Sequence, residues 1–252
     1  MDEIAVDAVA DPSLDEPVFL EGLPGVAHVG ALAARHLVDR FDGTVVRRVH
    51  SEHFPPQVTV EDGAPALTGS TVHAIDLDGR DALVLTGDHQ PQTPMGHYRL
   101  TDAYLDVAEA FGARTVVAMG GVPTGELIES YDVLAVASEA DLRDDLEAAG
   151  AAFRDDEPEG GIVGVSGLLV GLGARRGLST ACLMGETSGY LVDPKSATRV
   201  LEVLGSLLGV EIDTADLDER AEEMEAVVNR LREAEAGPQV EVPTDEDLRY
   251  IG

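Results

Sequence analysis

Residues 115–119 read TVVAM, a continuous apolar run that ends at a glycine pair. A short run that is apolar on both sides and rich in β-branched residues is typical of a strand covered on both faces of a parallel sheet. Residues 82–85 (ALVL) and 180–184 (TACLM) have the same character, and residues 18–20 (VFL) form a shorter run. We therefore expect these four segments to be buried strands of one mostly parallel sheet.

Helical patterns alternate with these strands. Residues 27–41 and 97–111 carry apolar side chains at helical spacing, and Asp193 before Pro194 predicts a helix start. Residues 162–172 are apolar all round, which predicts a fully buried helix. Residues 71–75 alternate like an antiparallel strand. The pattern predicts the α/β class, with a mixed, mostly parallel sheet covered by helices on both faces.

The chain divides into three predicted regions: an α/β domain over residues 1–210, a helical extension over 211–237 and an acidic tail over 238–252. Within the extension, a long helix from about residue 216 to 236 carries an apolar seam at heptad-like spacing. The seam consists of Leu217, Ala221, Met224, Val228 and Leu231. Packing on the protein's own body is the favoured interpretation, and packing against another subunit is the alternative.

The charge balance limits the classes of partner. The sequence has 48 acidic and 17 basic residues, a formal net charge of −31, which repels nucleic acid. It has no apolar run of about 18 residues and no signal peptide pattern at its start, so we predict a cytoplasmic protein without a membrane span. Acidity spread along the chain favours a halophilic-type surface over docking onto a basic partner.

Four carboxylates follow glycine-rich strand ends, where α/β proteins place ligand sites. They are Glu21, Asp88, Glu126 and Glu186. Together they form a candidate small-molecule pocket, since converging acids can bind a metal or serve in acid/base chemistry. The favoured alternative is turn chemistry, in which glycine makes the turn and the carboxylate caps the next helix. We assign no catalytic residue, metal or cofactor.

Two other reactive residue types fit structural roles better. Ser166 lies in the sequence GVSG, which lacks the glycine spacing of a nucleophile elbow. Cys182 lies inside an expected buried strand, where a thiol is unreactive, and as the single cysteine it excludes an internal disulfide.

Several segments resemble the proteasome assembly chaperone family in its archaeal form. They are residues 21–30 (EGLPGVAHVG), 54–58 (FPPQV), 85–92 (LTGDHQPQ), 120–126 (GGVPTGE), 162–169 (IVGVSGLL) and 182–190 (CLMGETSGY). The resemblance implies a fold similar to that of nucleoside phosphorylases, without an established reaction. It also implies a homo-oligomeric, chaperone-like protein that docks onto the proteasome α-ring through a C-terminal motif with a penultimate tyrosine.

The tail departs from that motif. Tyr250 is third from the end, and Arg249 precedes it in place of an apolar residue. Leu248, Tyr250 and Ile251 either anchor a variant docking mode or fold back on the protein's own surface. We expect a non-enzymatic, homo-oligomeric chaperone-like binding protein with proteasome α subunits as its partner. The alternative is an enzyme for a nucleoside-like molecule or another metabolite that uses the four strand-end acids.

Overall fold

The computed structural model describes residues 3–222, apart from residues 62, 127, 129 and 156–159. Its strands are β1 (Ile4–Ala8), β2 (Val18–Glu21), β3 (Thr44–Ser51), β4 (Val58–Glu61), β5 (Ala64–Leu67), β6 (Ser70–Asp76), β7 (Asp81–Gly87), β8 (Thr115–Pro123), β9 (Val133–Ala137) and β10 (Ser179–Thr187). Its helices are the short 3-10 helix η1 (Val26–His28), α1 (Val29–Arg40), α2 (Pro94–Ala110), α3 (Ala140–Ala148), α4 (Gly164–Arg175) and α5 (Pro194–Leu208). Residues 215–222 are also helical.

Eight strands form one mixed sheet, in the order β1-β3-β6-β7-β2-β8-β10-β9. β7, β2, β8 and β10 are adjacent and parallel, and the parallel, doubly covered character is the one that their apolar runs predict. The four other strands pair antiparallel with their neighbours. The predicted α/β class is confirmed, but "mostly parallel" is not exact, because four antiparallel pairings accompany three parallel ones. On one side of the sheet the chain runs through β3, β6 and β7 without the crossover helix that parallel neighbours need.

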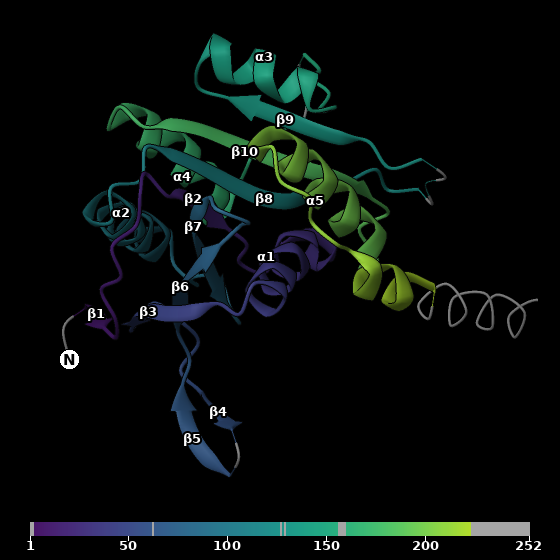
Figure 1. The fold of residues 1–252 in the computed structure, drawn as a ribbon. Coiled ribbons are helices and arrows are strands. Elements are labelled where there is room, and N and C mark those ends of the chain that lie inside the picture. Colours follow the sequence, from purple (N-terminus) through teal and green to yellow (C-terminus); the bar gives the residue numbers. More distant parts are fainter. Residues whose placement is uncertain (1–2, 62, 127, 129, 156–159, 223–252) are drawn as a thin grey trace, which may run out of the picture.

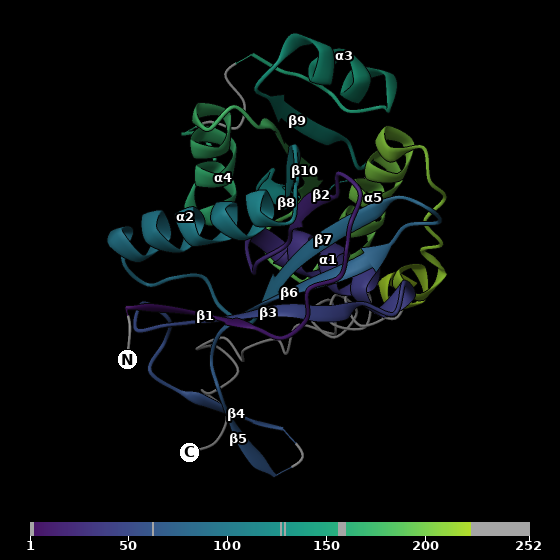
Figure 2. The ribbon, with the colours of Figure 1, turned by 60° about the vertical axis from the view of Figure 1, so that its left-hand side comes forward.

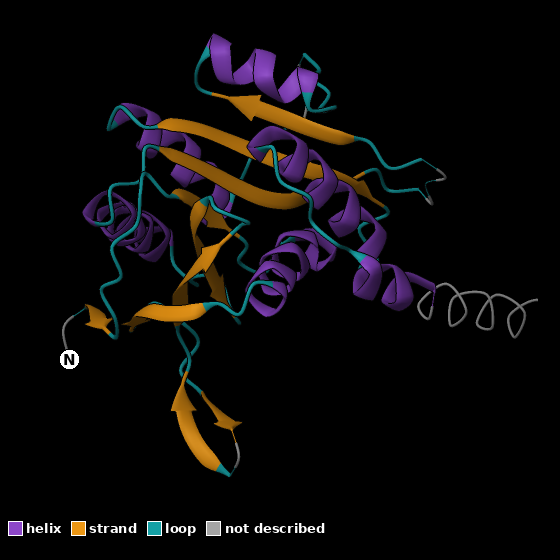
Figure 3. Cartoon of the chain, in the orientation of Figure 1, coloured by secondary structure: helices purple, strands orange, loops and turns teal. Residues whose placement is uncertain are grey.

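Helices cover both faces of this sheet (Figures 1 and 3). On one face, Val29 of α1 and Val200 of α5 belong to the same buried core as Val117 of β8. On the other face, Leu169 of α4 shares a core with α2 and with Leu83 of β7. α3 lies beside the edge strand β9 (Figure 1).

Glycines allow α1 to approach the sheet closely. A Cβ atom added to Gly30 would lie 2.0 Å from the carbonyl oxygen of Met119 in β8. One added to Gly22, just after β2, would lie 2.2 Å from the carbonyl oxygen of Gly30. Real Cβ atoms do not come this close to backbone oxygens, so the two glycines set the distance between α1 and the central strands.

The apolar helix expected over residues 162–172 is α4, and only one of its sides is buried. Val165, Leu169 and Gly173 are spaced by four residues and are buried, whereas Val163, which precedes the helix, is 83% exposed. The prediction of a fully buried helix is wrong, because α4 lies on the outside of the sheet and has a free side. None of the helices in the described part of the chain, α4 included, has the length and apolar character needed to cross a bilayer.

The beginning of the expected C-terminal helix packs on the protein's own body. Leu217 and Ala221 are buried, and Leu217 belongs to the core shared by α1 and α5. Nε2 of His36 lies 2.7 Å from the carbonyl oxygen of Asp213, which ties α1 to the segment before this helix. The remaining predicted seam and tail residues lie outside the described part of the chain: Met224, Val228, Leu231, Leu248, Tyr250 and Ile251.

β4 and β5 form a separate hairpin that extends away from the main sheet (Figures 1 and 2). Val58 pairs with Leu67 and Val60 with Pro65, which places four apolar side chains on one face of the hairpin. Val58, Val60 and Leu67 are 53%, 74% and 58% exposed. A two-stranded hairpin is marginally stable in water by itself, so this apolar face is suited to contact another surface.

Candidate functional site

Two of the four predicted strand-end acids pair with arginines. Asp88 accepts a hydrogen bond from Arg35 of α1 over 2.8 Å, and both side chains are more than half exposed. Arg154 donates to Glu186 over 2.8 Å and to Asp132 over 2.9 Å. Solvent-exposed pairs such as the first contribute at most about 1 kcal/mol. In both pairs the carboxylate is directed to an arginine of the same chain.

The two other acids differ from each other in burial. Glu126 is exposed in the loop after β8, where the hydroxyl of Thr124 donates to its carbonyl oxygen over 2.9 Å. Glu21 ends β2 and has no exposed surface. The four acids thus have four different surroundings, and none of them lines the cavity at the central strand ends. Glu21 is the one that lies next to residues of that cavity.

The Glu21 carboxyl is buried with one oxygen unpartnered. Oε1 accepts a hydrogen bond from the backbone N–H of Leu23 over 2.8 Å, whereas no group lies within hydrogen-bonding geometry of Oε2. Burial raises the pKa of Glu21 to about 7, although the Leu23 N–H and the nearby Ser166 hydroxyl each lower it. A carboxyl with such a pKa is present in both protonation states near neutral pH.

Two further ionisable groups lie close enough to Glu21 to sense its charge. They are Tyr104 of α2 and Cys182 of β10. Burial raises the pKa of both groups, and negative charge on Glu21 raises it further, while a 2.8 Å hydrogen bond with Ser70 partly offsets the effect on Tyr104. The thiol of Cys182 therefore stays protonated at neutral pH, which makes it a poor nucleophile, as its position in the sequence predicts.

A cavity of about 720 Å³ lies at the carboxyl ends of β2, β8 and β10. In α/β proteins, ligands bind outside the carboxyl ends of the strands, at the point where the strand order reverses from one side of a central strand to the other. Here β2 is such a central strand, because β7 lies on one side of it and β8 on the other. The walls come from the loop after β2, the last residues of β8, the start of α2, the middle of β10 and the segment that leads into and begins α4. They include Leu23, His97, Gly120, Ser166, Cys182 and Met184.

The strand register places Glu21 on the side of the sheet that bears the cavity. Glu21 pairs with Ala118, and Ala118 pairs with Cys182. Two residues further along, Gly120 pairs with Met184. Because side chains alternate between the faces of a sheet, these positions share one face. A Cβ atom added to Gly120 would meet no atom within 4 Å, so Gly120 leaves room for the cavity there.

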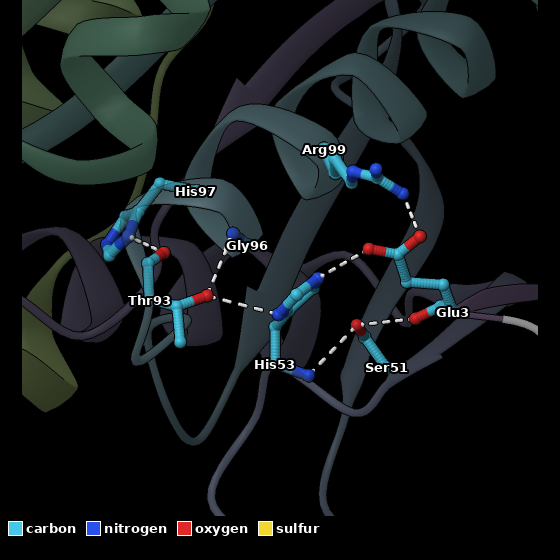
Figure 4. Close-up of polar contacts among 7 residues, drawn as sticks. All are labelled: Glu3, Ser51, His53, Thr93, Gly96, His97 and Arg99. Carbon is cyan, nitrogen blue, oxygen red and sulfur yellow. Dashed lines mark hydrogen bonds and ion pairs between the residues drawn. The ribbon is translucent and has the colours of Figure 1, made fainter.

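A polar network fixes the start of α2 (Figure 4). Thr93 is the N-cap: its hydroxyl accepts from the Gly96 N–H over 3.0 Å and lies 3.1 Å from Nδ1 of His53. Nε2 of His53 lies 3.1 Å from a carboxylate oxygen of Glu3, which also pairs with Arg99. Nucleophilic sites use the same order of hydroxyl, imidazole and carboxylate. Since the Thr93 hydroxyl already caps the helix, we assign the network to holding the helix end that forms one wall of the cavity.

The same network contains the described residues that could share a metal ion. Ligand atoms of Glu3, Glu52 and His53 all lie within 4.8 Å of one another. Glu3 and His53 are hydrogen-bonded to each other, and Glu3 is paired with Arg99. A cation would have to displace both interactions, so the geometry favours a structural tie between β1, β3 and α2.

The sequence predicts a pocket of acidic side chains at the carboxyl ends of the strands, and the cavity that the structure has at this edge is lined by other residue types. Among the described residues, no Asp, Glu, Lys or Arg lines the cavity, and its walls are glycine backbone and mostly apolar side chains, with Gln90 and His97 as polar exceptions. Ser166, predicted to be structural, contributes a polar group to the wall. The available signal was Gly120 at the end of a buried apolar run, because a glycine there removes a side chain that would fill the space.

The fold and the cavity define an α/β protein with a mixed sheet, two helical layers and a mostly apolar pocket at the carboxyl ends of its central strands. The chain belongs to the PAC2 family, whose model matches residues 19–232. The Methanocaldococcus jannaschii protein MJ1210 is similar to it, with 36% identity over 244 residues that cover 95% of this chain and 93% of that one.

Two solved structures from Pyrococcus furiosus are also similar. PbaB, described as an archaeal proteasome activator, is 34% identical with a TM-score of 0.85, covering 92% of this chain and all of that one. PbaA, described as an archaeal homolog of proteasome-assembly chaperone, is 26% identical with a TM-score of 0.76, covering 92% and 93%. The predicted resemblance to the archaeal proteasome assembly chaperone family is confirmed.

Proposed function

We propose that this protein is a non-enzymatic, homo-oligomeric, chaperone-like protein that binds proteasome α subunits. The observation that carries the proposal is the likeness to PbaB, an archaeal proteasome activator, along the whole length of that chain. The likeness to PbaA, a homolog of proteasome-assembly chaperone, supports the same partner. The separate surroundings of the strand-end acids and the protonated thiol of Cys182 support a binding role over an acid/base or thiol reaction.

We further propose that Leu248, Tyr250 and Ile251 form the contact with the proteasome. Three large apolar side chains in a polar segment suit a peptide that inserts anchors into a pocket of a partner. Each buried anchor contributes about 1.5–3 kcal/mol.

Replacing these three residues by alanine is therefore expected to weaken binding to immobilised proteasome α subunits at least about tenfold. The variant Asp247→Asn is the matched control, because it changes the same segment without removing an anchor. Surface plasmon resonance in molar KCl measures both. Unchanged binding of the triple variant would exclude the tail mode, and failure of the full chain to bind any α subunit would exclude the whole proposal.

The apolar face of the β4–β5 hairpin supports the homo-oligomer. The face projects from the body with three half- to three-quarter-exposed side chains, and a second copy of the chain would cover it. Val60 is the most exposed of the three, so a change there leaves the fold of the monomer intact.

Val60→Asp would place a charge in the proposed interface, where burying it is unfavourable. Light scattering is therefore expected to give a smaller particle mass for this variant than for wild type. Thr59→Asp, on the opposite face of the same strand, is expected to leave the mass unchanged. A wild-type particle with the mass of one chain, or a Val60→Asp particle of wild-type mass, would contradict the role of the hairpin.

A further inference from the structure

The cavity at the strand ends has the size of a small-molecule site. Its volume of about 720 Å³ lies within the range of roughly 300–1,000 Å³ typical of such sites. It is bounded by several separate segments, including the start of α2, which the network around His53 holds in place (Figure 4). A space of this size with mostly apolar walls offers water few hydrogen bonds, so an apolar molecule gains by replacing water there.

The lining also limits the charge of an occupant. Asp and Glu make up 48 of the 252 residues, yet among the residues that the structure describes no Asp, Glu, Lys or Arg lines the cavity. The polar side chains on this described wall are Gln90, His97 and Ser166. An anion would find no Lys or Arg there, inside a protein whose net charge is −31. The described lining therefore favours an uncharged molecule.

The inner end of the cavity supplies a specific polar contact. Ser166, from the first turn of α4, lines the wall. The Ser166 hydroxyl lies near the Glu21 carboxyl, which has no exposed surface and whose Oε2 has no hydrogen-bond partner. A carboxylate only accepts hydrogen bonds, so it favours a Ser166 hydroxyl that donates inward and presents its lone pairs to the cavity. Those lone pairs can accept a hydrogen bond from an occupant.

We propose that this cavity is a binding site for an uncharged, mostly apolar small molecule, whose N–H or O–H group donates to Ser166, with Glu21 as the residue that positions the Ser166 hydroxyl. The proposal concerns a site separate from the tail and the hairpin. It therefore does not depend on the proteasome as partner.

Indole and benzofuran test the polar contact, because they have nearly the same shape and only indole has an N–H group. Calorimetric titration of the full chain at pH 8 in molar KCl is expected to give a dissociation constant of about 0.1–1 mM for indole. Benzofuran is expected to bind about tenfold more weakly. Equal affinities, or no binding of either compound up to about 10 mM, would overturn the proposal.

Three variants locate the site. A Cβ atom at position 120 would meet no other atom within 4 Å, so the side chain of Gly120→Leu can extend into the cavity. This variant is expected to bind both compounds at least about tenfold more weakly. Its melting temperature is expected to equal that of wild type. Ser166→Ala is expected to reduce the preference for indole to less than about twofold while benzofuran binds as before. The matched control is Ser179→Ala. Ser179 lies at the start of β10, and its hydroxyl donates to Glu139. This variant is expected to keep the preference for indole over benzofuran.

Glu21→Gln separates positioning from mere support of the fold. A glutamine amide can donate to Ser166, so the serine hydroxyl is no longer held in one direction. The expected result is a several-fold smaller preference for indole with an unchanged affinity for benzofuran. Equal weakening of both compounds would show that Glu21 only supports the fold, and unchanged binding in Gly120→Leu would place the site elsewhere. Either result would overturn the assignment.

Discussion

Gly30→Ala is expected to lower the free energy of unfolding by about 3 kcal/mol or more. The added methyl group would lie 2.0 Å from the carbonyl oxygen of Met119, and this atom belongs to the backbone of the central strand β8. The clash cannot be relieved by rotating a side chain. α1 must move away from the sheet, which opens the core that it shares with α5 and β8.

Gly171→Ala is the matched control, because Gly171 is also a helical glycine. It lies on the exposed side of α4 with no atom within 4 Å of an added Cβ. There the methyl group only restricts the unfolded chain, so this variant is expected to be more stable than wild type by about 0.5–1 kcal/mol. Guanidinium denaturation in molar KCl measures both variants. Changes of the same sign would show that helix propensity, and not contact with β8, governs position 30.

The stability of the wild-type protein relative to Glu21→Gln is expected to fall as the pH rises from 5 to 8. Burial raises the pKa of Glu21 from 4.5 to about 7 on folding. The folded protein therefore binds this proton more tightly than the unfolded chain does. The stabilisation is fully present below pH 4.5 and is lost as the pH rises through 7. The change amounts to about 3 kcal/mol, at 1.36 kcal/mol for each pKa unit.

Comparing the two proteins in the same buffers isolates this residue, because all other acids are common to both. Denaturation curves at several pH values in molar KCl provide the free energies. The difference between wild type and Glu21→Gln is expected to change mainly between pH 5 and 7 and to level off above that range. If the stabilities of wild type and Glu21→Gln changed in parallel with pH, Glu21 would titrate alike in the folded and unfolded chain. The conclusion that its carboxyl is buried would then be wrong.

The central strands and most helices could be predicted from the sequence because their signals are local. Residues 82–85 and 115–119 are apolar on both sides, and the structure covers both faces of β7 and β8 with helices. Asp193 before Pro194 marks the start of α5, and its carboxylate accepts from the Ser196 N–H as an N-cap should. Such features depend on a few neighbouring residues.

The order of the strands and the partners of the charged groups could not be predicted, because they depend on residues far apart in the chain. Nothing near Asp88 indicates that Arg35 of α1 will bind it. The exposed side of α4 was missed for a similar reason, since an apolar sequence does not reveal how many layers will cover it. The lining of the cavity at the predicted edge could not be derived either, because a space is defined by side chains that are absent, as at Gly120.

The place of β2 in the sheet has a consequence for biosynthesis. β2 is made early, yet it lies between β7 and β8, which the ribosome supplies much later. Until residue 123 has left the exit tunnel, at least one edge of this apolar strand has no neighbour to pair with. Unpaired edges promote aggregation of nascent chains. We therefore expect slow translation of the segment between β7 and β8 to reduce the yield of soluble product.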